Sequence, residues 1–523
     1  MRGFKAWRPL LVTVACWLAP ASAPAQAGLP KHFDREVRRA LARFQVPGAA
    51  IAIVKDGRVL WLGGYGFRRL GAPAPVTPHT LFQIGSNTKA FTAASLALLV
   101  DSARLHWGDR VTRYLPGFEL ADPWVTRELT VRDLLTHRSG LGVGAGDLLW
   151  LHSTLSRQEI LHRLRAARPA TSFRSRYAYD NVLYAAAGEI VPAVTGMSWE
   201  AFVRARLLAP LGMTDTRTGI GDLGPGDSLA TPYAGGDGQP VVVPLDSVDN
   251  IAPAAALVSS AADLSKWVQV QLDSGRAGGR VLWTVDQTRE MWAPQTVIPI
   301  EEPEPPLAAL RPSFFAYGLG WRLRDYRGRK IVWHTGGLAG MTSRITLVPE
   351  ERLGIVVLTN GDSDLPDAVT YEILDHFFKA PRTDWVSAFG QVADHDRAAA
   401  DSLVAAWRST RDSLSPPPLA LPRYAGLYRD SLYGDASITV ERGKLVFRLS
   451  RSPAFTGDLE HWQYDTFITR WHAANLAAAF LTFDLAPDGS VAGVRLAPVS
   501  PLADFSFDYQ DLHFVPVRGP NPP

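Results

Sequence analysis

The sequence predicts an α+β protein followed by a small all-β unit, and three observations support this prediction. Strand patterns occur near residue 50 and return between residues 330 and 359. The long region between them mixes helical patterns with Gly- and Pro-rich connections. Short alternating apolar and polar segments fill the chain after residue 423. Strands at both ends of a helical region predict one antiparallel sheet, flanked by helices and joined to a helical subdomain.

The N-terminus has the features of a secretory signal peptide over residues 1–27. Three basic residues precede an apolar run at 9–18, and small residues follow up to Ala27. This pattern is typical of an exported protein, with cleavage near Ala27 or, alternatively, near Ala23. The apolar run is shorter than the ~20 residues that span a bilayer, so an uncleaved anchor is the weaker interpretation.

The only cysteine, Cys16, lies inside that segment. A lipoprotein would carry its lipid there, but the neighbouring residues fit that motif poorly. The mature chain would then have no thiol, which excludes disulfides and cysteine catalysis. Losing residues 1–27 also changes the formal charge from +3 to 0, because they hold three basic residues and no acidic one. We therefore expect a periplasmic or secreted protein with no nucleic-acid partner and no stable membrane span.

Residues 28–380 carry the patterns of the main domain. Apolar runs at 49–54 and 59–61 flank an Asp-Gly pair, which predicts a hairpin. Apolar residues in a helical register follow from Thr88 to about Leu105. Further helical patterns lie at 156–166, 199–208 and 261–272, strands at 330–333, 342–348 and 353–359, and a last helix at 367–378.

Two further segments complete the chain. Residues 381–422 form a linker, with a weak helical stretch and the Pro-rich run 415–418. In residues 423–518, apolar and polar side chains alternate in short segments separated by turns. This pattern predicts a small barrel or sandwich. Because none of the chemical motifs described below falls in this unit, we expect it to have an auxiliary role.

Ser86 and Lys89 are the first candidate functional pair. Residues three positions apart share one face of a helix, so the Lys89 amine can reach the Ser86 hydroxyl. A desolvated lysine can become a neutral base at physiological pH, whereas arginine cannot. The spacing alone is a weak signal, since a capping serine and a surface lysine give the same pattern.

The second motif is Tyr179-Asp180-Asn181, before an apolar helical stretch. A tyrosine near a catalytic lysine can relay protons if the cation lowers the pKa of its phenol. Asn181 can accept a hydrogen bond from Lys89 and donate one to a substrate carbonyl. The alternative is that Tyr179 and Asn181 only pack and turn the chain, with no catalytic role.

The third motif, His334-Thr335-Gly336-Gly337, stands at the end of a predicted strand. The two glycines let a substrate lie close to the backbone. The Gly337 amide can form an oxyanion hole together with the Ser86 amide. The alternative is an ordinary strand end with a partly exposed histidine.

The combination and order of these motifs decide between the interpretations. Over about residues 32–380 the chain resembles the serine β-lactamase and penicillin-binding-protein superfamily, and within it the class C β-lactamase-related hydrolases. Four other segments are also similar to that family, at 81–85, 134–141, 210–213 and 317–321. The resemblance implies a β-lactamase-like fold. The C-terminal β unit is similar to a small domain appended to such hydrolases.

The resemblance also implies roles for the motif residues. Ser86 is then the nucleophile of an acyl-enzyme mechanism, Lys89 the general base and Tyr179 the relay to the leaving group. The implied substrate contacts are Asn181, His334, Thr335 and Gly336. We expect no cofactor and no metal, because no metal-ligand spacing or dinucleotide fingerprint is present.

The substrate stays open at this stage. True β-lactamases begin the third motif with a lysine that helps hold the substrate carboxylate, whereas His334 is mostly neutral near pH 7. Esterase, D-amino-acid peptidase and β-lactamase activities all fit, on small esters, peptides or lactams and on cell-wall peptides. A catalytically silent protein that binds peptidoglycan or a partner is the alternative. The acidic segment 301–306 is expected to be a solvated loop or, alternatively, a lid.

Overall fold

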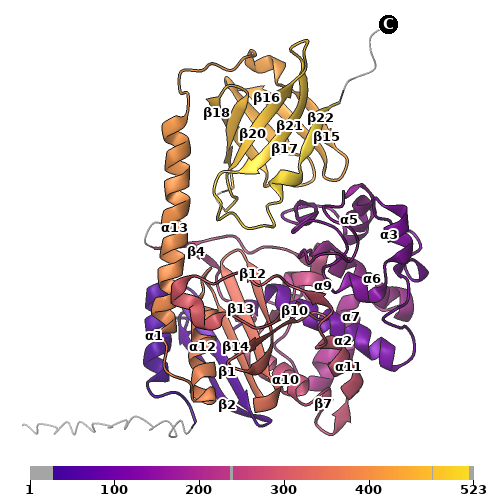
Figure 1. Ribbon diagram of the computed structural model, residues 1–523, viewed down its shortest axis with the longest axis vertical. Coiled ribbons are helices and arrows are strands. Elements are labelled where there is room, and N and C mark those ends of the chain that lie inside the picture. The colour runs from indigo at the N-terminus through magenta and orange to yellow at the C-terminus, as the bar shows by residue number, and fades with distance from the viewer. Residues whose placement is uncertain (1–27, 236–238, 474, 518–523) are drawn as a thin grey trace, which may run out of the picture.

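The computed structural model describes residues 28–235, 239–473 and 475–517. The predicted signal peptide and Cys16 lie outside the described residues. The described chain forms a main domain and a β-barrel, joined by one long helix (Figure 1). None of the described helices is long and apolar enough to cross a membrane.

An eight-stranded antiparallel sheet lies at the centre of the main domain, in the order β2-β1-β14-β13-β12-β11-β10-β9. The first hairpin pairs with a late strand, with Ala49 opposite Thr359. The prediction that both ends of the domain share one sheet is therefore confirmed. The strands are β1 (Gly48–Lys55), β2 (Arg58–Gly66), β9 (Thr296–Val297), β10 (Phe315–Tyr317), β11 (Arg322–Tyr326), β12 (Arg329–Leu338), β13 (Met341–Val348) and β14 (Leu353–Thr359).

Helices cover both faces of this sheet. On one face α1 (Phe33–Phe44), α12 (Leu365–Phe378) and the start of α13 (Trp385–Thr410) enclose an apolar core. On the other face α10 (Ala261–Leu272) packs against β1 and β14. This layered α+β arrangement agrees with the sequence prediction.

The helical subdomain lies on the α10 side of the sheet and contains the central helix α2 (Thr88–Asp101). Eleven of the 14 residues of α2 are buried, Lys89 among them, so the amine of this lysine is removed from water. Around it lie α3 (Pro123–Glu128), α4 (Val131–Leu134), α5 (Arg157–Arg163), α6 (Val182–Thr195), α7 (Trp199–Val203), α8 (Ala209–Leu211), α9 (Ala252–Ala255) and α11 (Val285–Met291). Three small two-stranded sheets pair β3 (Phe82–Gln83) with β6 (Val258–Ser259), β4 (Tyr233–Gly235) with β5 (Pro240–Val242), and β7 (Arg276–Ala277) with β8 (Arg280–Val281).

The C-terminal unit is a closed eight-stranded barrel, β15 to β22, which confirms the predicted all-β domain. Closure leaves no unpaired strand edge. The first turns of α13 pack against the main domain, and the rest of the helix runs to the barrel (Figure 1). The strands are β15 (Gly426–Asp430), β16 (Gly434–Glu441), β17 (Lys444–Leu449), β18 (Thr456–Gln463), β19 (Thr466–Trp471), β20 (Ala479–Leu485), β21 (Val491–Pro498) and β22 (His513–Pro516).

The short 3₁₀ helix η1 (Gly85–Asn87), which carries Ser86, packs directly on β12. A Cβ on Gly336 would lie 1.8 Å from the Ile84 carbonyl oxygen, so only glycine fits there. By contrast, a Cβ on Gly337 would meet no heavy atom within 4 Å. The expectation that both glycines make room for a substrate is therefore wrong for Gly336, whose missing side chain admits the protein's own backbone.

Gly336→Ala is accordingly expected to destabilise the protein by ~1–3 kcal/mol or more, because the added methyl group forces η1 away from β12. Gly337→Ala is the matched control and should change the stability by about 0.5 kcal/mol or less. Thermal melts of both variants give the comparison. Equal melting temperatures for the two variants would show that the contact between η1 and β12 is not tight.

Candidate active site

The first two sequence motifs meet at the amine of Lys89. Lys89 lies in the first turn of α2, and its Nζ is 3.0 Å from Ser86 Oγ. The same amine donates to Asn181 Oδ1 at 2.7 Å and to the Ala254 carbonyl at 3.2 Å. Lys89 is fully buried, whereas Ser86 is partly exposed. The hydroxyl is thus accessible from outside while the amine beside it is not.

Burial sets the protonation of Lys89. It lowers the pKa of the Lys89 amine to about 7, with a small further lowering from Arg322 and an opposing effect from Asp147 and Asp180. A neutral amine has two N–H groups, which satisfy Asn181 and Ala254, and one lone pair, which is left to face the Ser86 hydroxyl. The geometry therefore suits a lysine that accepts a proton from Ser86.

Tyr179 lies against this pair, with its ring centroid 4.8 Å from Lys89 Nζ. The expectation that a neighbouring cation lowers the pKa of its phenol is wrong. Burial raises that pKa above the ordinary value of a tyrosine, and the opposing effects of Ser86 and Arg322 are smaller. Tyr179 is therefore a neutral phenol near pH 7, a proton donor rather than a phenolate.

The Asn181 side chain is oriented by Asp147, a residue that the sequence motifs did not reveal. Asn181 Nδ2 donates to Asp147 Oδ2 at 2.9 Å, which turns the amide oxygen toward Lys89. Asp147 also accepts a hydrogen bond from Trp150 Nε1 at 2.7 Å. Burial raises the pKa of Asp147 to about 7. Its only sequence signal was an acidic residue between a glycine-rich loop and an apolar run.

His334 is buried and neutral. Its Nδ1 lies 2.6 Å from the Thr335 carbonyl and its Nε2 lies 3.0 Å from the Tyr317 hydroxyl. Since a carbonyl only accepts, Nδ1 donates to it and Nε2 accepts from Tyr317. Burial lowers the pKa of His334 well below its ordinary value, with the charges of Arg322 and Lys89 adding to the effect. His334 thus presents no positive charge to a substrate near pH 7.

The remaining residues of the third motif lie beside η1. Thr335 is partly exposed, Gly336 is buried and Gly337 is exposed on β12. A Cβ on Gly85 would lie 2.8 Å from the Gly337 amide nitrogen, so this amide is next to the turn that carries Ser86. The structure therefore brings together all the site residues predicted from the sequence.

The family follows from the comparison with known proteins. The family described as Beta-lactamase matches residues 33–377, which is more than half of the chain. The chain belongs to the β-lactamase family of serine hydrolases. Residues 410–516 match a second family, described as Domain of unknown function (DUF3471).

Three relatives of this β-lactamase-family chain are informative. "Unguisins hydrolase ungD'" of Aspergillus campestris is 30% identical over 449 residues, covering 82% of this chain and 81% of the relative. The octameric penicillin-binding protein homologue from Pyrococcus abyssi superposes with a TM-score of 0.58 at 21% identity, covering 93% and 99% of the two chains. The D-amino acid amidase from Ochrobactrum anthropi SV3 gives a TM-score of 0.53 at 25% identity and covers 66% and 97%.

The barrel of this β-lactamase-family chain touches the candidate site. The connection between β21 and β22 extends from the barrel toward the main domain (Figure 1). The Phe505 ring on it lies 5.7 Å from the Tyr179 ring. The Asp508 carboxylate accepts hydrogen bonds from the backbone amides of Gly146, Asp147 and Leu148 at 2.9, 3.1 and 3.2 Å. A residue of the C-terminal domain therefore holds the turn that presents Asp147, a contact that the expected auxiliary role did not include.

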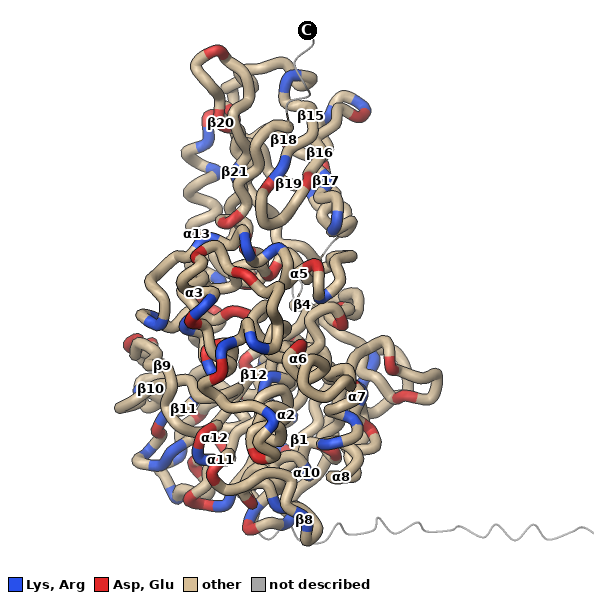
Figure 2. The backbone as a smooth tube through the Cα atoms, turned by 90° about the vertical axis from the view of Figure 1, so that its right-hand side faces the viewer, with Lys and Arg blue, Asp and Glu red and all other residues tan. Residues whose placement is uncertain are grey.

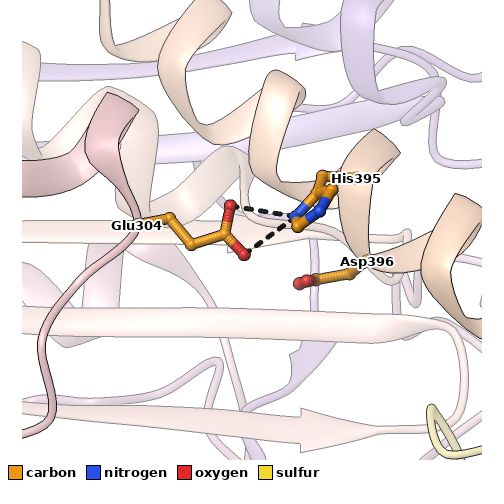
Figure 3. A group of neighbouring side chains, drawn as sticks. All are labelled: Glu304, His395 and Asp396. Atoms are coloured by element: carbon orange, nitrogen blue, oxygen red, sulfur yellow. Dashed lines mark hydrogen bonds and ion pairs between the residues drawn. The ribbon is translucent and has the colours of Figure 1, made fainter.

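One group within the described residues has the composition of a metal site, namely Glu304, His395 and Asp396 (Figure 3). His395 Nδ1 lies 3.1 Å from the Glu304 carboxylate. His395 and Asp396 are exposed on α13. The group therefore belongs to the α13 side of the sheet, and the contact holds part of the acidic segment 301–306 against that helix.

Asp508→Ala is expected to lower the stability by ~1–3 kcal/mol, because buried backbone amides at 146–148 lose their acceptor. Turnover should fall as well, since Asp147 is no longer held beside Asn181. Thermal melts and initial rates measure the two effects. Asp401→Ala, an exposed change on α13, is the control and should have neither effect. If Asp508→Ala had the same melting temperature and the same turnover rate as that control, the contact between the barrel and residues 146–148 would not matter for the site.

Proposed function

We propose that this protein is an exported serine hydrolase that cleaves esters or amide-like acyl donors through an acyl-enzyme intermediate on Ser86. One observation carries the proposal, the Lys89 amine 3.0 Å from the Ser86 hydroxyl with its pKa lowered to about 7 by burial. A base with a pKa near the working pH accepts a proton efficiently. The geometry supports Lys89 as that base.

Acylation would proceed in two steps. Neutral Lys89 takes the hydroxyl proton as Ser86 Oγ attacks the substrate carbonyl carbon, and the amides of Ser86 and Gly337 stabilise the oxyanion. When the tetrahedral intermediate collapses, the phenol of Tyr179 gives its proton to the leaving group and regains one from the Lys89 ammonium. Water then attacks the acyl group by the same route and releases the acid, which restores the Ser86 hydroxyl.

The substrate class follows from His334 and from the relatives. A neutral histidine at this position supports ester or amide cleavage over a specialised β-lactamase, since it offers no charge to a β-lactam carboxylate. The relatives named as a hydrolase of unguisins and as a D-amino acid amidase support the same class. We therefore favour small esters or peptides, with cell-wall peptides among the candidates.

Two features support the proposed location and partners. The pattern of residues 1–27 supports export to the periplasm or the medium. Basic and acidic residues are interspersed along the described chain (Figure 2), which is consistent with a small-molecule or peptide substrate rather than a nucleic acid.

The proposal is tested with a parallel panel of short p-nitrophenyl esters, D-alanine p-nitroanilide and nitrocefin. We expect the ester turnover to exceed that of nitrocefin. Ser86→Ala should lose at least about 1,000-fold in kcat, because the nucleophile is absent. A strong preference for nitrocefin would reverse the proposed order of substrates, and full activity of Ser86→Ala would refute the acyl-enzyme mechanism.

Lys89→Arg is the matched variant in that panel. Arginine keeps the positive charge but cannot become neutral, so acylation should fall about 100-fold or more. A thermal melt of the same variant separates this loss from unfolding.

A further inference from the structure

A cavity of about 450 Å³ lies between the barrel and the main domain. Most of its lining residues come from three segments: 150–152 after η3 (Asp147–Leu149), 337–339 at the end of β12, and the barrel connection at 502–507. Asp246, Thr342, Asp362 and Asn475 complete the walls. Gly337 is one of the lining residues, and its amide lies beside the turn that carries Ser86. A substrate acylating Ser86 would therefore have this cavity next to its reacting carbonyl.

The charges that line the cavity are predominantly negative. The lining includes Asp246, Asp362, Asp504 and His152, with no lysine or arginine. Asp246 and Asp362 come from the main domain, and Asp504 comes from the barrel connection. The carboxylates of Asp362 and Asp504 each accept a backbone amide, from Gly340 at 3.0 Å and from Ser506 at 2.8 Å.

Asp246 is the member of this set that points most clearly to a ligand. It is only 5% exposed, yet its Oδ1 has no hydrogen-bond donor among the described residues. The Nδ1 atom of His152 lies 3.7 Å from this oxygen, which is too far for a hydrogen bond. A buried carboxylate oxygen without a donor costs free energy unless a ligand supplies one.

The electrostatics of the other carboxylates agree with this interpretation. Loss of hydration raises the pKa of Asp362 to about 6, and repulsion from Asp504 and Asp246 adds to the shift. Like charges facing one another across a cavity are stabilised when a cation enters between them.

The spacing of these carboxylates favours an organic cation over a metal ion. Among the described residues, the one set of three acidic or histidine side chains with ligand atoms all within 4.8 Å is Glu304, His395 and Asp396. No three of the described acidic and histidine side chains in the cavity walls are therefore close enough together to hold one ion at metal–ligand distances of about 2.0–2.6 Å. Trp150 and Phe507 in the walls also provide aromatic surface, which attracts an ammonium group.

We propose that this cavity is a substrate subsite for a positively charged amine, and that Asp246 and Asp504 are its recognition residues. The inference rests on the proposed function, because it assigns the charged group to a substrate that acylates Ser86. It gives the C-terminal barrel a part in selecting the substrate, through Asp504. The favoured substrates are then esters or amides that carry an ammonium or guanidinium group on the acyl or the leaving-group side.

Two matched pairs of substrates test the subsite. On the acyl side, p-nitrophenyl 6-(dimethylammonio)hexanoate, whose N–H can donate to Asp246, is compared with p-nitrophenyl 7-methyloctanoate, in which a C–H group replaces the charged N–H. On the leaving-group side, protonated S-(2-dimethylaminoethyl) thiobutyrate is compared with S-(3-methylbutyl) thiobutyrate. We expect kcat/KM to favour the cationic member by about tenfold in at least one pair, mainly through KM, as one close charge pair with a buried carboxylate can provide.

Asp246→Asn and Asp504→Asn should each reduce that preference, and the double variant should bring it close to one. Asp504 is exposed, so Asp504→Asn keeps the test available if Asp246→Asn fails to fold. Asp401→Asn, an exposed change on α13, is the matched control and should keep the wild-type preference.

Equal turnover of the charged and neutral members in both pairs would overturn the subsite and leave the hydrolase intact. A preference that survives the double variant would also overturn it. An enzyme that cleaves no member of either pair and none of the simple esters would contradict the proposed function itself.

Discussion

The Lys89 amine is buried among three oxygen partners, and the rest of the candidate site depends on this placement. In water a lysine stays protonated at neutral pH and cannot act as a base. Inside α2 the loss of hydration outweighs the attraction of Asp147 and Asp180, so the neutral form becomes accessible. The same burial explains why Tyr179 stays a phenol and His334 stays uncharged. Exclusion of water from one buried environment thus sets the protonation states of Lys89, Tyr179 and His334.

The fold keeps this environment closed by contacts between distant parts of the chain. Gly336 allows η1 to press against β12, which brings the Ser86 turn next to Gly337. Asp508 of the barrel holds the turn at 146–148, Asp147 in that turn orients Asn181, and Asn181 accepts from Lys89. The contacts that position the Lys89 amine therefore extend from the main domain into the C-terminal domain. The cavity is lined by residues of both domains. The C-terminal domain can therefore also affect which substrates reach Ser86.

Much of the fold and most of the site could be predicted from the sequence, because the informative signals are local. A hairpin, a helical register and three short motifs are enough to single out Ser86, Lys89, Tyr179 and Asn181. Segments of alternating apolar and polar residues also predicted a β unit after residue 423. Its closure into a barrel depends on which strands pair, and the alternation does not reveal that pairing.

The residues that sequence reasoning missed act across long separations. Ala254 and Asp147 have no motif, and their parts in the site appear only when the chain is folded. Asp508 lies 361 residues from Asp147, in a domain without catalytic motifs. The predicted direction of the Tyr179 pKa shift was wrong for a related reason. A neighbouring cation can be inferred from a motif, whereas complete burial cannot.

The most direct test of this account is the protonation of Lys89 itself. With ¹³Cε-labelled lysine the protein gives one resonance for each lysine, and the Lys89 signal is the one absent from Lys89→Arg. We predict that this signal titrates with a midpoint of about 7. A midpoint above about 9, close to that of an ordinary lysine, would contradict the claim that burial makes Lys89 a neutral base.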